Sequence, residues 1–131
     1  MSIKFNTIKH ADFTLEEFDL FRGAVEEYGD LTLNQVMSKM DQGLVQAWFF
    51  TGPTGNRVVL LTLLRQDELY VMQSLGQGIL RHMEYVLECL EAFAKLYSKK
   101  KVSAAIVPWM KSYAERKYDF KVSHYVITKE I

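Results

Sequence analysis

The feature that most constrains the fold is a long amphipathic helix, predicted over residues 79–98 directly after a short apolar strand. Its apolar residues recur at helical spacing and are Ile79, Leu80, Met83, Val86, Leu87, Leu90, Phe93, Ala94 and Tyr97. A stripe this wide has to be buried against another layer of secondary structure. Since strands are predicted on both sides of the helix, that layer is expected to be a β-sheet.

The remaining elements follow from turn residues, helix caps and apolar runs. The predicted order is strand 3–8, a helix that begins after the N-cap Thr14 and ends near 28, a shorter helix between Thr32 and Gly43, strands 44–51, 58–64 and 69 to about 72, the long helix, strand 102–107, a short helix over 110–118 and strand 121–130. The three strands before the long helix are separated by turn-forming segments, which indicates an antiparallel meander. The fold class is therefore α/β, in the order β-α-α-β-β-β-α-β-α-β, with a mixed, mostly antiparallel sheet flanked by helices.

Length and charge narrow the class of protein. A chain of 131 residues with 49% hydrophobic residues is sufficient for one domain, 1–131, with a substantial core. Sixteen basic residues balance sixteen acidic ones. A neutral chain gives no electrostatic reason to expect nucleic acid or an anionic membrane as a partner.

The sequence also argues against several kinds of site. Its single cysteine, Cys89, excludes an intrachain disulfide and a cysteine-cluster metal site, and is expected to be a buried, inert thiol. The three histidines are scattered, so no metal site is predicted. No apolar run reaches the roughly 18 residues of a membrane span, and the polar start of the chain does not resemble a signal peptide. We expect a cytoplasmic protein, or one packaged into a virion assembled there.

A glycine-containing segment, Gln73-Ser74-Leu75-Gly76-Gln77-Gly78, lies between the predicted strand and the long helix. Glycines at such a junction leave backbone N–H groups exposed, and the positive end of the helix dipole favours an anion at the same place. The segment is therefore predicted to hold a phosphate group.

This motif and the order of elements resemble the GNAT acetyltransferase superfamily over nearly the whole chain. The family carries Q/R-x-x-G-x-G/A before its third helix, and Gln73, Gly76 and Gly78 match that pattern. The resemblance implies acetyl-CoA as the cofactor, held where the fourth strand splays from the fifth. The cofactor-binding residues that it implies are Val71, Gln73, Gly76, Gln77 and Gly78.

The resemblance further implies transfer of an acetyl group from the CoA thioester to an amine acceptor. Such a transfer needs a base or a water chain for the amine and an acid for the leaving thiolate. Tyr113 and Tyr118 are the candidate acids, and Glu68 or Asp67 the candidate base.

An alternative interpretation is a catalytically inactive GNAT-fold protein that acts through protein partners, with a possible homo-oligomer. The chain departs from the family pattern at Glu115, where the family often has a tyrosine, and at Asp119, which replaces a glycine. It is similar in pattern to small GNAT-like proteins of bacteriophages, including an internal virion protein. In this alternative, Met72, Leu75 and Trp109 fill the space between the fourth and fifth strands.

Overall fold

One mixed sheet runs through the part of the chain that the structure describes. The computed structural model describes residues 4–28, 31–52, 55, 57–76, 82–105, 121–123 and 126–131. The strands are β1 (Lys4–Thr7), β2 (Val45–Thr51), β3 (Arg57–Leu64), β4 (Glu68–Gly76), β5 (Lys101–Ala105), β6 (Lys121–Ser123) and β7 (Val126–Glu130). The helices are η1 (His10–Asp12, a 3₁₀ turn), α1 (Leu15–Tyr28), α2 (Leu33–Asp41) and α3 (Met83–Leu96).

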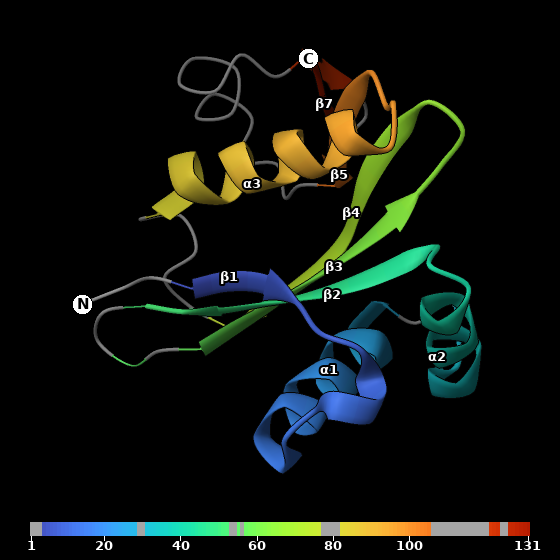
Figure 1. Cartoon of the computed structure of the whole chain (residues 1–131), viewed down its shortest axis with the longest axis vertical. Coiled ribbons are helices and arrows are strands. Elements are labelled where there is room, and N and C mark those ends of the chain that lie inside the picture. The colour runs from blue at the N-terminus through green and yellow to red at the C-terminus, as the bar shows by residue number, and fades with distance from the viewer. Residues whose placement is uncertain are drawn as a thin grey trace.

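The sheet order is β1-β2-β3-β4-β5-β7-β6 (Figure 1). Strands β1 to β4 pair antiparallel in sequence, which confirms the predicted meander. Strand β5 pairs parallel with β4, and β7 then pairs antiparallel with β5. A parallel neighbour needs a crossover connection, and α3 lies within that connection. The predicted α/β class with a mixed, mostly antiparallel sheet is therefore confirmed.

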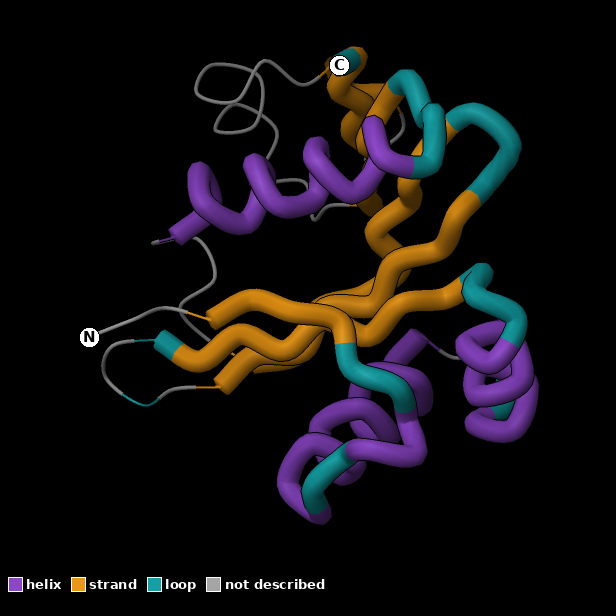
Figure 2. The backbone as a smooth tube through the Cα atoms, in the orientation of Figure 1, coloured by secondary structure: helices purple, strands orange, loops and turns teal. Residues whose placement is uncertain are grey.

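Helices cover both faces of the sheet (Figures 1 and 2). The burial of β2 agrees with this two-sided cover, because the side chains of residues 45–50 are all buried. Trp48 and Phe50 belong to the cluster under α3, whereas Ala47 and Phe49 belong to the cluster under α1 and α2. Since successive side chains of a strand point to opposite faces, a continuous apolar run is what a doubly covered strand requires.

The helix ends follow local rules. The Thr14 hydroxyl accepts a hydrogen bond from the Glu17 N–H at 3.1 Å, and the Glu17 carboxylate accepts one from the Thr14 N–H at 2.8 Å. Thr32 and Gln35 form the same reciprocal capping box at the start of α2. Ser98 has φ 59°, a left-handed conformation that ends α3 after Tyr97. The predicted N-cap at Thr14 and the helix start after Thr32 are confirmed.

Two strand predictions were wrong. The strand predicted to end near Met72 continues to Gly76, because β3 continues to pair with it as far as Val58. The single strand predicted over 121–130 is a hairpin of β6 and β7. Alternation of side chains continues through both arms of a hairpin, so this pattern alone does not distinguish one strand from two.

Other predictions fall partly or wholly outside the described residues. The predicted helix over 110–118, Trp109 and the end of the strand over 102–107 lie there entirely. Positions 79–81 of the predicted long helix also lie there, and the described helix begins at Met83 with His82 as its N-cap.

Candidate functional site

Strands β4 and β5 are paired over only the first part of β4. Their last paired residues are Val71 and Ala104, whereas β4 continues along β3 to Gly76. Residues 72–76 therefore have no β5 partner among the described residues; we call their β5-facing side the β4 edge. A strand edge of this kind can form hydrogen bonds with an extended ligand that carries amide groups.

A β-bulge lies at the same point of β4. Thr62 pairs with Val71 and Leu61 pairs with Gln73, so that Met72 is the additional residue in the bulged strand. A bulge bends a strand and increases its local twist, and bulges are over-represented next to functional sites. The bulge thus marks the place where β4 departs from β5.

The N-terminus of α3 lies at the same end of the sheet. The ring centroids of His82 and Phe50 are 5.1 Å apart. Phe50 pairs with Val58 of β3, and Val58 in turn pairs with Gly76 at the end of β4. The His82 side chain makes no capping hydrogen bond to the helix. A helix N-terminus without a side-chain cap presents N–H groups and a positive dipole end to an anion.

The predicted phosphate segment is divided by the structure. Gln73 and Gly76 lie within β4, paired with Leu61 and Val58, so this part is strand and not loop. Gln77 and Gly78 lie outside the described residues. Residues 73–76 of the segment therefore lie in β4.

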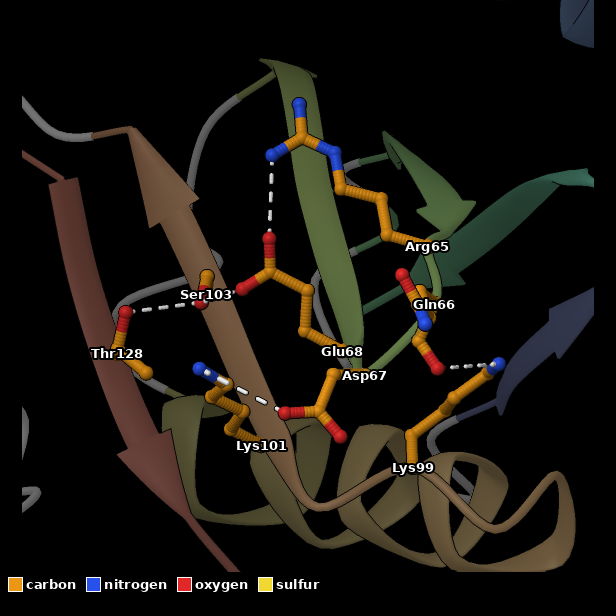
Figure 3. A network of polar contacts seen from close by, with 8 residues as sticks. All are labelled: Arg65, Gln66, Asp67, Glu68, Lys99, Lys101, Ser103 and Thr128. Atoms are coloured by element: carbon orange, nitrogen blue, oxygen red, sulfur yellow. Dashed lines mark hydrogen bonds and ion pairs between the residues drawn. The ribbon is translucent and has the colours of Figure 1, made fainter.

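Glu68 lies at the opposite end of the β4–β5 pair (Figure 3). Its Oε2 accepts a hydrogen bond from the hydroxyl of Ser103, and its Oε1 accepts one from Arg65 at 3.1 Å. Ser103 also shares a hydrogen bond of 2.8 Å with Thr128 of β7. Oε2 thus links β4 to β5 and Oε1 contacts the β3–β4 turn, and no sequence motif indicated either contact.

Asp67, next to Glu68, also contacts the start of β5 and the residue before it. Its Oδ2 lies 3.8 Å from Nζ of Lys101 (Figure 3), and its carbonyl accepts a hydrogen bond from the N–H of Lys100. Val71, the end of the paired ladder, is three residues from Glu68, or about 10 Å along an extended strand. The two candidate bases are therefore not adjacent to the β4 edge.

The other candidates are placed as follows. Tyr113 and Tyr118 lie outside the described residues. Met72 is buried in the cluster under α1 and α2, and Leu75 packs against that cluster. Leu75 touches α1 closely, since its Cδ2 is 2.9 Å from the position of a Cβ built on Gly23.

Cys89 lies half-buried on α3 beside Tyr85. Burial raises the pKa of the Cys89 thiol and the nearby Glu88 carboxylate adds to this, while the hydrogen bond with the Tyr85 hydroxyl opposes it. The neighbouring thiol raises the pKa of Tyr85 in turn. A raised pKa keeps the thiol protonated, which disfavours a role as a nucleophile.

We expect iodoacetamide to alkylate Cys89 more slowly in the folded chain than in urea, with the midpoint of the pH–rate profile at higher pH. The folded chain holds the thiol proton more tightly, so folding stability falls as the pH rises past the pKa of the unfolded thiol. Rates measured from pH 7 to pH 10 test this expectation. A folded profile with an earlier midpoint would contradict the environment described for the thiol.

Among the described residues, no group of three or more His, Cys, Asp or Glu side chains is arranged to hold a metal ion. The described helices are too short or too polar to cross a bilayer.

Comparison with solved structures identifies the fold. A GNAT family acetyltransferase from Elizabethkingia anophelis, crystallised with acetyl-CoA bound, matches over 98% of both chains with a TM-score of 0.64 and 11% identity. A GNAT family acetyltransferase from Staphylococcus aureus Mu50 matches over 97% of this chain and 99% of that one, with a TM-score of 0.56 and 8% identity. Neither protein-family models nor curated proteins match the sequence. The chain thus has a GNAT-like α/β fold over nearly its full length.

Proposed function

We propose that this protein is an acetyl-CoA-dependent N-acyltransferase. The observation that carries the proposal is the coincidence of two features at one end of the sheet. The β4 edge begins after the last β4–β5 pair, at Val71 and Ala104, and the N-terminus of α3 lies at that same end. An extended ligand with amide groups and a phosphate at one end matches both features.

In this proposal the pantetheine arm of acetyl-CoA lies along the β4 edge. Val71 and Gln73 lie on either side of the bulge at Met72, where the arm would meet the strand. Gly76, Gln77, Gly78 and the first N–H groups of α3 are proposed to receive the pyrophosphate. The similarity to a GNAT acetyltransferase crystallised with acetyl-CoA supports this choice of ligand.

Acetyl-CoA supplies an acetyl group activated as a thioester. The amine of the acceptor attacks the carbonyl carbon, a C–N bond forms, the C–S bond breaks, and the amine loses a proton while the thiolate gains one. Tyr113 or Tyr118 is proposed as the acid for the thiolate. Because Glu68 lies about 10 Å along the strand from Val71, its proposed role as base requires intervening water.

We expect about 1 mM acetyl-CoA to raise the thermal unfolding midpoint by several degrees. A ligand at about 100 times its dissociation constant adds about 2.7 kcal/mol to folding stability. Differential scanning fluorimetry with and without the ligand measures the shift. An unchanged midpoint at this concentration would exclude the acetyl-CoA proposal.

A matched pair of variants locates the phosphate. His82→Asp and His82→Asn both provide a good N-cap for α3, and both lose the ring contact with Phe50. Only the aspartate carries a negative charge, which repels a bound phosphate. The acetyl-CoA shift should therefore be smaller in His82→Asp than in His82→Asn. Equal shifts would place the phosphate away from the α3 N-terminus.

The second candidate function is that of a catalytically inactive GNAT-fold protein acting through protein contacts, such as a virion or accessory protein. This candidate expects side chains to fill the space between β4 and β5, but Met72 and Leu75 pack in the cluster under α1 and α2 instead. Without acetyl-CoA binding, this candidate becomes the better explanation of the fold.

A further inference from the structure

The outer surface of α3 carries a second apolar row besides the one that faces the sheet. The inner face consists of Val86, Leu87, Leu90 and Ala94, all buried. The second row consists of Tyr85, Cys89, Ala92 and Leu96, and of these Cys89 also packs against the cluster under α3. Tyr85 is 40% exposed and Leu96 is 77% exposed, while Ala92 is exposed and Cys89 half-buried.

The spacing of this row is that of a coiled-coil seam. Successive members are four, three and four residues apart, the alternation that keeps one line of side chains directed at a partner helix. The row extends for about 16 Å along α3, at about 1.5 Å per residue. Exposed apolar side chains arranged in a line indicate a contact surface more strongly than the same residues scattered over a surface.

We propose that two copies of this chain associate through this row, with their α3 helices antiparallel about a two-fold axis. Antiparallel pairing places Tyr85 against Leu96 of the second copy and Cys89 against Ala92 of the second copy. Each contact occurs twice by symmetry, so one row supplies both sides of the interface. The small Ala92 and Cys89 lie at the centre, where the helices can approach closely.

The charges beside the row select this orientation. Glu88 and Lys95 each precede a member of the row by one residue, so both lie on the same flank of α3. In the antiparallel register each Glu88 lies on the same side of the seam as Lys95 of the second copy, whereas in a parallel pair these flanks lie on opposite sides of the seam and the two charges do not meet. Neither side chain forms an ion pair within the described part of the chain. Flanking charges of this kind set partner orientation in helix pairs.

The interface is small. A single pair of helices with four apolar positions each falls below the roughly 1,200 Å² of a stable protein–protein interface. The dimer is therefore expected to be weak, with a dissociation constant on the order of 10–100 µM. This inference does not depend on acetyl-CoA binding.

Sedimentation velocity of the full chain, from about 5 µM to about 1 mM, tests the association. We expect the mean mass to rise with concentration from that of a monomer toward that of a dimer. Leu96→Glu places a charge within the row and should weaken association by about tenfold or more. Leu15→Glu is the matched control, because Leu15 is 88% exposed on α1, which covers the opposite face of the sheet.

A charge exchange tests the antiparallel register. Glu88→Lys alone and Lys95→Glu alone each place like charges together across the interface and should weaken the dimer. The double variant Glu88→Lys/Lys95→Glu restores opposite charges and should recover association. If the single variants weakened association by changing the structure of the monomer, the double variant would not recover it.

Three results would overturn the proposal. A chain that remains monomeric at about 1 mM has no such interface, and the row then belongs to a different partner. A dimer that Leu96→Glu leaves unchanged uses another surface. A dimer in which the double charge variant is no better than either single variant has a different register.

Discussion

Replacing Phe50 with alanine is expected to reduce the free energy of unfolding by about 3–5 kcal/mol, the usual cost of truncating a buried phenylalanine. Phe50 is fully buried in the cluster between the sheet and α3. Its ring also contacts His82 at the α3 N-terminus. The substitution therefore leaves a cavity and removes a support of the candidate phosphate site. Urea denaturation followed by circular dichroism measures the loss.

Two further variants separate the effect on stability from the effect on the site. Phe50→Leu and Phe49→Leu remove similar volumes from opposite faces of β2, since Phe49 packs with Phe13 under α1. Under the proposed function, Phe50→Leu should weaken acetyl-CoA binding more than Phe49→Leu. A loss of less than about 1 kcal/mol for Phe50→Ala would contradict the packing of α3 on β2.

Thr62→Val is expected to cost about 2–4 kcal/mol although it nearly preserves the shape of the side chain. The fully buried Thr62 hydroxyl accepts a hydrogen bond from Nε1 of Trp48 and donates one to Oε1 of Gln46, each 2.8 Å long. The Gln46 amide in turn donates to the carbonyl of Gly43. Valine removes both bonds of the hydroxyl at once and leaves polar atoms of Trp48 and Gln46 in an apolar layer.

Thr62→Ser is the matched control, because it keeps the hydroxyl and removes only a methyl group. We expect it to cost about 1 kcal/mol, close to one buried methylene. Thermal or urea unfolding of the two variants measures the difference. If valine and serine destabilise equally, the hydrogen-bonded chain through Thr62 contributes nothing beyond packing.

Local sequence signals predicted most of the described elements. The N-cap at Thr14 requires only residues three positions apart, so it is visible in the sequence and was confirmed. The nearly continuous apolar run from Val58 to Leu64 is likewise what a strand covered on both faces requires, and residues 58–62 of β3 are all buried. These patterns are local because a helix or strand satisfies its hydrogen bonds and buries its apolar side chains through residues of one short segment.

The candidate site was less predictable. The glycine motif predicted a phosphate-binding segment between the strand and the long helix, but its residues Gln73 and Gly76 belong to β4. The end of a strand depends on how far its neighbour continues, and β3 continues far enough to pair with Gly76. The bulge at Met72 is set by the same pairing and has no signature of its own in the sequence.

By itself, the sequence determined the α/β class, the meander and the N-cap at Thr14, because these depend on periodicity and on contacts between near neighbours. The tertiary structure alone decided where β4 parts from β5 and that Glu68 ties β4 to Ser103. It also decided that the row through Tyr85 and Leu96 lies outside the core. Each of these depends on pairing or packing between segments distant in the chain, which a pattern within one segment does not contain.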